Sequence, residues 1–299
     1  MLPLVPTKKV VVFGSGGQLG VELVSEFQRR GYAVTPFDRS SVDVSDAAAV
    51  ERAIAVVDPQ FVVNAAAYNQ VDVAEKEPAA AYMANALAVR NLAMASRQVD
   101  AQLIHFSTDY VFDGTAGRSY TEEDPTHPLG AYAVSKLGGE LYAQAYLDKP
   151  LIVRTSGVFG PGGLRTARGN FIELMLRLAA GKQPIRVVED HVASPTYAPA
   201  LASRTLDLME RGLGGVFHIG GGMAVSWFEY ARMIFNAAGL NPELQPTNER
   251  GYRTAARRPK YSALSNGKME RTGVQPMPPL ADAIKDYMEK RKQYFEPRS

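Results

Sequence analysis

The chain has 299 residues, of which 46% are hydrophobic and 21% charged, a composition typical of globular proteins with one or two domains. Its 33 Lys and Arg nearly balance 31 Asp and Glu, so the net charge of +2 gives no electrostatic reason to expect nucleic acid or an anionic membrane as a partner. The lack of cysteine excludes disulfides and thiolate chemistry, and the four scattered His do not suggest a zinc motif. No apolar run reaches the ~18 residues that span a bilayer, and the first residues lack the order of a signal peptide. We therefore expect a cytoplasmic protein.

Through the first 160 residues, short apolar runs alternate with stretches of helical periodicity. Strands are expected at 8–14, 33–38, 61–68, 102–112 and 150–160, the fourth of them running into a loop. Helices are expected at 18–32, 46–59, 78–98 and 131–140. Asp46 is a suitable N-cap for the second of these helices. Such alternation with short connections predicts an α/β fold, a Rossmann-type doubly wound parallel sheet with helices on both faces.

The pattern loosens after about residue 160. Helices are expected at 171–181, 226–239 and 278–295, the second capped by Ser226, and one more buried strand at 215–221. We divide the chain into a first domain of residues 1–160 and a smaller, intertwined C-terminal α/β domain of residues 161–299. The strand near 215–220 is expected to return to the main sheet.

A glycine-rich stretch, GSGGQLG, lies between the first strand and the first helix. Its glycines, Gly14, Gly17 and Gly20 among them, allow a sharp turn and a close approach to a pyrophosphate, and the following helix offers amide donors at Gln18 and Leu19. Asp38 ends the second strand and is placed to bind the adenosine ribose hydroxyls. The combination favours dinucleotide binding; the alternative is a turn whose glycines serve only tight packing.

Arg39 follows Asp38 directly and leaves the type of dinucleotide open. An arginine could bind a 2′-phosphate, whereas an aspartate favours a free hydroxyl. The sequence offers both, so NADH and NADPH are equally compatible with it. The alternative for Arg39 is a solvated charge on a loop.

Two further stretches end strands at the same predicted edge of the sheet. NAAAY, residues 64–68, carries small side chains that leave room for a ligand, or that serve close helix packing. STDYVFDG begins at Ser107 and supplies Thr108, whose hydroxyl can both donate and accept a hydrogen bond, or can serve a turn.

Tyr132 and Lys136 are four residues apart in an expected helix, so they share one of its faces. A free tyrosine has a pKa of ~10, and a nearby lysine and a cationic nicotinamide would both favour its phenolate. A tyrosine tuned in this way can protonate a carbonyl oxygen as hydride reaches the carbonyl carbon. The pair follows a predicted dinucleotide site in the chain, which favours a catalytic role over two ordinary surface residues.

Together these motifs resemble the extended short-chain dehydrogenase/reductase superfamily, and more narrowly the dTDP-4-dehydrorhamnose reductase family. The similarity runs along nearly the whole chain. The glycine and tyrosine–lysine elements are common to the superfamily, whereas STDYVFDG, SPTYAP and the RP-x-x-S-x-L pattern that begins at Arg258 are more specific.

The resemblance implies a role for each matching residue. The catalytic set would be Thr108, Tyr132 and Lys136. Residues implied in cofactor binding are Gly14, Gly17, Gln18, Leu19, Gly20, Asp38, Arg39, Asp43, Val44, Ala65, Ala66, Ala67, Tyr68, Phe106, Tyr132 and Lys136. Residues implied in binding the sugar nucleotide are Thr108, Asp109, Gly157, Arg257, Arg258 and Ser262, where the two arginines suit a diphosphate because the guanidinium binds oxyanions bidentately. A charged surface loop is the alternative for those arginines.

One position departs from the family pattern. The family's RTSWVYG stretch carries a tryptophan at the sugar site, whereas this chain reads RTSGVFG with Gly157 there. Loss of an aromatic wall would widen the pocket and leaves the identity of the sugar open.

The resemblance implies a reductase that transfers hydride from NAD(P)H to the 4-keto group of a nucleotide-activated deoxysugar, dTDP-4-dehydro-L-rhamnose in particular. The residues from 161 onward would then mainly bind the substrate. Two alternatives stay open: a non-catalytic dinucleotide-binding module resembling the regulatory subunit of methionine adenosyltransferase, and a nucleotide-sugar epimerase. Some relatives use Mg²⁺, for which this sequence offers no clear ligand cluster, and a homodimer is left open.

Overall fold

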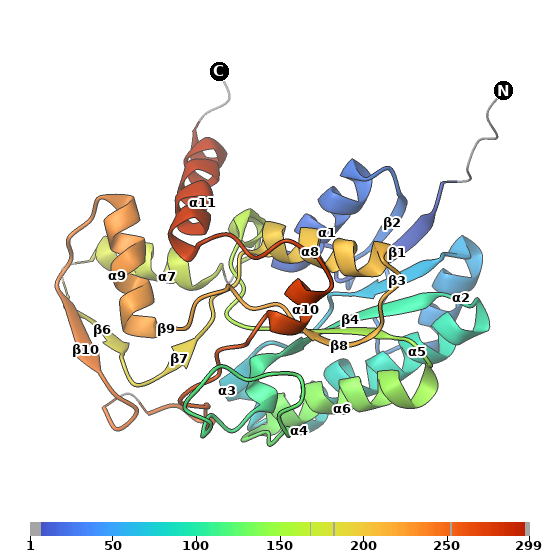
Figure 1. Cartoon of the computed structure of the whole chain (residues 1–299), viewed down its shortest axis with the longest axis horizontal. Helices are drawn as coiled ribbons and strands as arrows, with labels where there is room; N and C mark the ends of the chain where they lie inside the picture. The colour runs from blue at the N-terminus through green and yellow to red at the C-terminus, as the bar shows by residue number, and fades with distance from the viewer. Residues whose placement is uncertain (1–6, 168, 182, 252, 297–299) are drawn as a thin grey trace.

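The computed structural model describes residues 7–167, 169–181, 183–251 and 253–296. Its central sheet has six parallel strands in the order β2-β1-β3-β4-β5-β8 (Figure 1). The strands are β1 (Lys9–Phe13), β2 (Ala33–Phe37), β3 (Phe61–Asn64), β4 (Gln102–Thr108), β5 (Leu151–Thr155) and β8 (Gly215–His218). The strand order reverses beside β1, and the carboxyl ends of β1, β3, β4 and β5 meet at one edge of the sheet, where ligands bind in folds of this kind.

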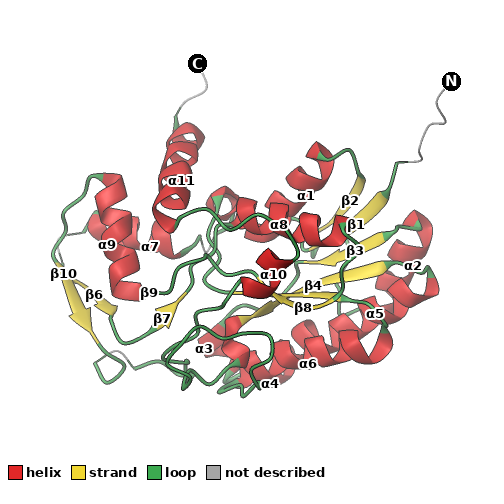
Figure 2. Ribbon diagram, viewed as in Figure 1, coloured by secondary structure: helices red, strands yellow, loops and turns green. Residues whose placement is uncertain are grey.

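Helices cover both faces of this sheet, as Figure 2 shows. One face packs against α1 (Gln18–Arg29) and α8 (Ala198–Glu210), and the other against α2 (Ala47–Val57), α5 (Ala88–Gln98) and α6 (Ala131–Tyr146). The doubly wound Rossmann-type α/β fold predicted from the sequence is therefore confirmed. No helix of the described residues is long and apolar enough to cross a membrane.

The two helix caps expected from the sequence are confirmed. The Asp46 side chain accepts a hydrogen bond from the backbone N–H of Ala49 at the start of α2, and Ser226 does the same for Glu229 at the start of α9 (Trp227–Ala238). Each cap satisfies one of the N–H groups that a first helical turn leaves without a partner.

The long helix predicted over residues 78–98 is interrupted. It consists of α4 (Pro78–Tyr82), a π-helical turn η1 (Met83–Leu87) and α5. Asn85 lies in this turn, where its side-chain amide bonds both the N–H and the C=O of Tyr68 and also the Ser135 hydroxyl. The wide turn thus ties the loop after β3 to α6, which no periodicity in the sequence would indicate.

A second, smaller core lies beside the main sheet. It is formed by α7 (Phe171–Ala179), α9 and α11 (Leu280–Phe295) with two short sheets, β6 (Ile185–Val188) paired with β10 (Leu244–Thr247) and β7 (Val192–Ala193) paired with β9 (Val225–Ser226). The chain crosses between the two cores more than once, since α8, β8 and α10 (Gly267–Arg271) all lie beyond residue 160 yet pack with the main sheet. The division into domains at residue 160 stays a prediction.

The turn from β1 to α1 leaves no room for a side chain at Gly14 or at Gly20. Gly14 has a φ of +76°, and a Cβ atom there would lie 2.5 Å from the backbone nitrogen of Ala66. A Cβ atom on Gly20 would lie 2.1 Å from the carbonyl oxygen of Gly14. The glycines therefore allow β1, the end of β3 and the start of α1 to approach one another closely.

We expect Gly20→Ala to lower the free energy of unfolding by about 1–3 kcal/mol, because the added methyl group forces the turn away from α1. Chemical denaturation measures this loss. Gly16→Ala is the matched control: its Cβ atom would lie 3.8 Å from the nearest heavy atom, the Cβ of Asp38, and should change the free energy of unfolding by less than about 0.5 kcal/mol. Equal losses in the two variants would contradict this account of the turn.

Candidate active site

A cavity of about 520 Å³ opens at the carboxyl edge of the sheet. It is bounded by the start of α1, the ends of β3, β4 and β5, and the first turns of α6. Of the residues predicted from the sequence, it brings together Gly17, Gln18, Leu19, Ala65, Ala66, Ala67, Phe106, Thr108, Asp109, Tyr132, Lys136 and Gly157. Residues as far apart in the chain as Gly17 and Phe171 thus line one site, where Gln18 Nε2 also donates to the carbonyl oxygen of Val158 at 2.8 Å.

The first turns of α6 carry Tyr132 and Lys136 on the face that borders the cavity. The helix begins at Ala131, whose N–H donates to the Glu75 carboxylate at 2.8 Å, so a side chain from a distant loop satisfies the helix start. The Tyr132 ring packs edge-on against Tyr110 with a centroid distance of 6.2 Å. Helical spacing and this packing place the phenol and the ammonium group at the same cavity, as the sequence predicts.

Lys136 is buried, with 3% of its surface exposed. Its Nζ atom donates to the carbonyl oxygen of Phe106 at 2.6 Å, which anchors α6 to the end of β4. Burial lowers the pKa of Lys136 to about 8, so the side chain is still a cation at neutral pH. An ammonium group has three donors, of which this carbonyl uses one.

Thr108 and Asp109 form a buried network at the end of β4. The Thr108 hydroxyl accepts from the N–H of Tyr110 and donates to Asp109 Oδ1, at 3.2 and 3.1 Å. Asp109 Oδ2 accepts from Ser156 at 2.8 Å and from Ser262 at 2.5 Å. Burial raises the pKa of Asp109 to about 6, an effect that the three hydroxyl donors oppose. The one proton of Thr108 is therefore directed at Asp109 while that carboxylate is ionised.

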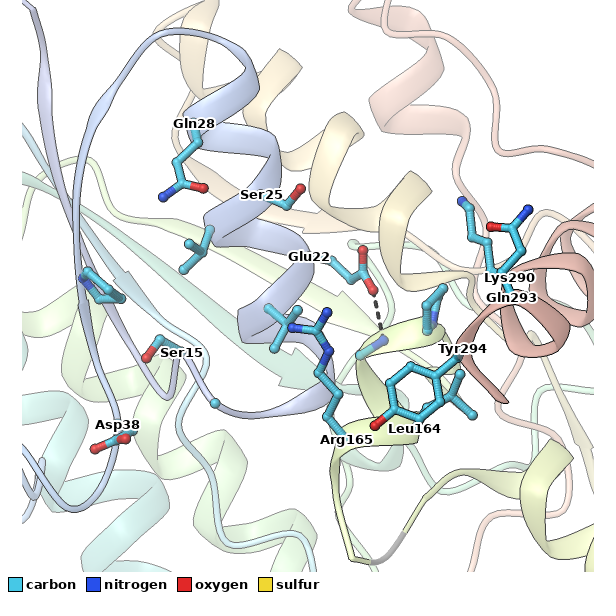
Figure 3. Close-up of a pocket in the computed structure, with 16 residues that line it drawn as sticks. Ser15, Glu22, Ser25, Gln28, Asp38, Leu164, Arg165, Lys290, Gln293 and Tyr294 are labelled. Atoms are coloured by element: carbon cyan, nitrogen blue, oxygen red, sulfur yellow. Dashed lines mark hydrogen bonds between the residues drawn. The ribbon is translucent and has the colours of Figure 1, made fainter. Parts of the chain in front are cut away.

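The sequence-predicted residues of the adenosine side lie elsewhere. Asp38 borders a second cavity of about 730 Å³, shared with Ser15 and Gly16 and extending along α1 to Arg165 and the C-terminal helix (Figure 3). Asp38 Oδ1 accepts hydrogen bonds from both the N–H and the hydroxyl of Ser40 and of Ser41, and these bonds lower its pKa to about 2. Gly16 faces this cavity and Gly17 faces the first, so a long ligand lying across the turn would reach both.

Other predicted cofactor residues lie outside the lining of the first cavity. Arg39 has a side chain that is 92% exposed, with its Nε atom 3.6 Å from Asp43 Oδ2. Val44 is buried in the core beneath α2 and α5. The Tyr68 hydroxyl donates to Glu77 at 2.9 Å. Gly14 and Gly20 shape the turn without bordering the cavity.

The three residues from the C-terminal part of the chain that are implied in binding the sugar nucleotide do not line the cavity. Arg258 binds Asp72 of α3 (Val71–Ala74) through both ends of its guanidinium group, at 2.7 and 3.0 Å. Arg257 is exposed and borders a small crevice with Tyr132 and Tyr110. Ser262 donates to Asp109. Binding of a diphosphate by Arg258 would require it to leave Asp72.

Several cavity residues were given no individual role from the sequence, although Asn64 and Ser107 belong to the motifs NAAAY and STDYVFDG that were placed at this edge. They are Asn64, Asn69, Ser107, Thr155, Val158, Thr166, Gly169 and Phe171. Ser107 and Thr155 are at the ends of β4 and β5, so the rule that placed Thr108 at the sheet edge could have found them. Thr166 and Gly169 lie in the irregular segment before α7, and Phe171 is the first residue of that helix. Only the tertiary fold brings these three residues to the cavity. Among the described residues, no group of three or more His, Asp or Glu is arranged to hold a metal ion.

Trp227 and Pro195 lie beside Gly157, and the wider pocket expected from the sequence stays a prediction. Gly157 has a φ of +50°, and a Cβ atom there would lie 3.3 Å from Cη2 of Trp227. The Trp227 ring in turn packs edge-on against Phe171 with a centroid distance of 4.7 Å. The indole of Trp227, at the start of α9, therefore lies against the backbone of Gly157.

We expect the free energy of unfolding to depend on pH because the ammonium group of Lys136 is buried in the folded protein. Between pH 8 and 10.5 the unfolded chain holds a proton on this lysine that the folded protein has released, so folding becomes more favourable as pH rises through that window. Relative to Lys136→Met, the free energy of unfolding of the wild type should rise by up to about 3 kcal/mol across it. Denaturant titrations of both proteins at several pH values measure the difference, and a constant difference would contradict a lowered pKa.

Comparisons with known proteins agree with this geometry. The family model described as RmlD substrate binding domain matches residues 8–293. dTDP-4-dehydrorhamnose reductase of Mycobacterium tuberculosis is 40% identical over 277 residues, which cover 91% of this chain and 89% of that protein. The spore coat polysaccharide biosynthesis protein SpsK of Bacillus subtilis is 36% identical and covers 95% of this chain and 98% of its own.

The solved structures that are similar to this chain include a reductase and an epimerase. The crystal structure of dTDP-4-dehydrorhamnose reductase from Bacillus anthracis in complex with NADP is similar with a TM-score of 0.90 and 33% identity, covering 95% of this chain and 99% of that one. The structure of UDP-glucose 4-epimerase from Thermus thermophilus in complex with NAD has a TM-score of 0.82 at 25% identity, covering 95% of this chain and 99% of that one. By the family model and by identity over most of its length, the chain belongs to the dTDP-4-dehydrorhamnose reductase family.

Proposed function

We propose that this protein is an NAD(P)H-dependent oxidoreductase that reduces the 4-keto group of a nucleotide-activated deoxysugar, dTDP-4-dehydro-L-rhamnose, to give dTDP-L-rhamnose. The observation that carries the proposal is that Tyr132 and Lys136 share one cavity with Thr108 and with the start of α1. The relatives named dTDP-4-dehydrorhamnose reductase support the choice of substrate.

The start of α1 fits the phosphates of a dinucleotide. The helix has 12 residues, and its N-cap, Gly17, offers no side-chain hydrogen bond to the N–H groups of the first turn. Those N–H groups, together with the helix dipole, suit an anion lying over Gly17, Gln18 and Leu19. Ala65, Ala66 and Ala67 leave the neighbouring wall free of bulk. When bound, the reduced dinucleotide supplies the hydride.

Lys136 prepares Tyr132 for proton transfer. As a buried cation at neutral pH, it stabilises negative charge that develops on the phenol oxygen of a tyrosine sharing its helix face. Tyr132 then donates its proton to the carbonyl oxygen as the carbonyl carbon is reduced. Lys136 keeps further N–H donors for the ribose next to the nicotinamide.

Thr108 orients the carbonyl beside Tyr132. Its hydroxyl proton is directed at Asp109, so a hydrogen bond from Thr108 to the substrate oxygen requires that proton to turn into the cavity. When the Thr108 proton turns into the cavity, Asp109 still accepts hydrogen bonds from the hydroxyls of Ser156 and Ser262. We propose that Asp109 acts on the sugar through Thr108, in addition to the substrate contact implied by the resemblance.

We favour NADPH, and NADH stays a testable second choice. Asp38 Oδ1 is engaged by Ser40 and Ser41, whereas the Arg39 guanidinium next to it is exposed and could meet a 2′-phosphate. The Bacillus anthracis relative was crystallised with NADP. We further place the protein in the cytoplasm without nucleic-acid or membrane partners, on its composition; a homodimer stays a prediction that light scattering would test.

We expect Tyr132→Phe to lower turnover by about 10²- to 10⁴-fold, because the variant has no proton to give to the carbonyl oxygen. The assay follows loss of reduced-nicotinamide absorbance with dTDP-4-dehydro-L-rhamnose generated in place, using NADPH and NADH separately. The dissociation constant for the reduced cofactor should change by less than about 3-fold. Tyr142→Phe, on the same helix but outside the cavity lining, is the control and should retain turnover. Wild-type turnover in Tyr132→Phe would contradict the mechanism.

The same assay separates the alternative functions. A reductase consumes one reduced nicotinamide for each sugar converted. An epimerase, a function held by the Thermus thermophilus structural neighbour, would convert sugars without net consumption. A regulatory cofactor-binding subunit would bind NADPH in calorimetry but would neither reduce nor epimerise a nucleotide sugar.

A further inference from the structure

Thr155, the last residue of β5, carries a buried hydroxyl without a role in the mechanism above. Thr155 is 7% exposed and lines the 520 Å³ cavity. Among the described residues, its Oγ1 atom has no hydrogen-bond partner. Buried hydroxyls nearly always have a partner, because burial removes them from water without compensation. A hydroxyl of this kind on a cavity wall indicates that the partner comes from a ligand.

The register of the sheet fixes the direction of this side chain. Thr155 pairs with Thr108 across the parallel ladder, so the two side chains point to the same face. The preceding Arg154 points to the opposite face, where it binds Glu140 of α6 at 2.7 Å. Thr155 therefore points to the face covered by α1. Ser107, also buried without a partner among the described residues, is paired with Arg154 and points toward α6 instead.

The surroundings of Thr155 suit a neutral polar group. The cavity wall on the α1 face includes Leu19, Phe106 and Val158, which are apolar. The two charged side chains of the cavity lining, Lys136 and Asp109, are held by the Phe106 carbonyl and by three hydroxyls. Among the described residues of the cavity lining, a phosphate or carboxylate would find no cation on this face to offset its charge.

We propose that Thr155 is a positioning residue for the cofactor, and that its hydroxyl hydrogen-bonds the carboxamide of the nicotinamide ring. The inference rests on the proposed function, which places the phosphates at the start of α1 and the ring near Tyr132. The carboxamide is the neutral polar group at that end of the dinucleotide, and it offers both a donor and an acceptor to a hydroxyl that can do either. By holding the carboxamide, Thr155 fixes the rotation of the ring and thus the face that is turned toward Thr108.

The test compares two ligands that differ in the nicotinamide. NADPH contains the ring and 2′,5′-ADP lacks it, so calorimetry with both isolates the contact at the carboxamide. We expect Thr155→Val, which keeps the shape and removes the hydroxyl, to weaken NADPH binding about 3- to 10-fold and to leave 2′,5′-ADP binding within about 2-fold of the wild type. Thr155→Ser restores a hydroxyl and should recover most of the NADPH affinity.

A control distinguishes this contact from a general effect of removing a buried hydroxyl. Ser96 in α5 is fully buried, and its Oγ atom also has no partner among the described residues, but it lies outside the cavity lining. Ser96→Ala should leave the affinity for both ligands unchanged. Without ligand, Thr155→Val should melt no lower than the wild type, because the hydroxyl it loses has no partner within the described protein.

Three results would overturn the inference. Equal losses for NADPH and 2′,5′-ADP in Thr155→Val would indicate a structural role. Unchanged NADPH affinity with a raised KM for the sugar nucleotide would assign the hydroxyl to the sugar. A wild-type protein that binds no dinucleotide would overturn the proposed function and this inference with it, whereas the first two results overturn the inference alone.

Discussion

The close approach of the β1–α1 turn to the end of β3 is the constraint on which the site depends. Neither Gly14 nor Gly20 could carry a Cβ atom without meeting backbone atoms at under 3 Å. Only because both lack one does α1 begin directly at the sheet edge, with the N–H groups of its first turn beside the ends of β3 and β4. The same turn separates the Asp38 cavity from the Tyr132 cavity. Gly16 lines the first of these cavities and Gly17 lines the second. A ligand with a polar phosphate centre and two distinct ends matches that layout.

Asp109 links the two cores of the molecule at the point where the chemistry is proposed. Its carboxylate accepts hydrogen bonds from three hydroxyls: that of Thr108 at the end of β4, that of Ser156 just after β5, and that of Ser262 in the C-terminal segment. No cation contributes to these bonds, so the desolvation of the carboxylate is offset only by the three hydroxyls and a backbone N–H, and the raised pKa of Asp109 reflects that incomplete compensation. The position of Ser262 therefore bears on the orientation of Thr108, although the two residues are far apart in the chain.

Much of the fold could be predicted because local signals and global fold agree in the first half of the chain. β-branched runs, glycine stops and caps such as Asp46 each have a local cause, and parallel pairing then brings strand ends to one edge. The π-helical turn at Asn85 could not be predicted, since it depends on contacts with Tyr68 and Ser135 from two other segments. α8 was missed for a related reason: its apolar face is defined by the main sheet, which lies on the other side of the predicted domain boundary.

The candidate site was predictable to the same extent. Residues at strand ends and on one helix face, Thr108, Tyr132 and Lys136, follow from periodicity and are brought together in the structure. Side chains on long or irregular segments do not follow from it. Arg258 carries the charge expected of a diphosphate ligand, but a carboxylate of α3 lies within reach and neutralises it. A sequence shows which groups a segment carries, whereas their partners are set by segments that arrive from elsewhere in the chain.

Gly157 shows how such a partner can change the meaning of a single residue. Judged from the sequence alone, a glycine in place of a tryptophan removes an aromatic side chain from the wall of the pocket. In the structure, the indole of Trp227 lies against the bare backbone of Gly157 and is held there by Phe171, which itself lines the cavity. A large side chain at position 157 would need both a strained backbone and the space that Trp227 fills. The two positions are therefore sterically coupled, and Phe171, which packs against Trp227, carries this coupling to the cavity lining.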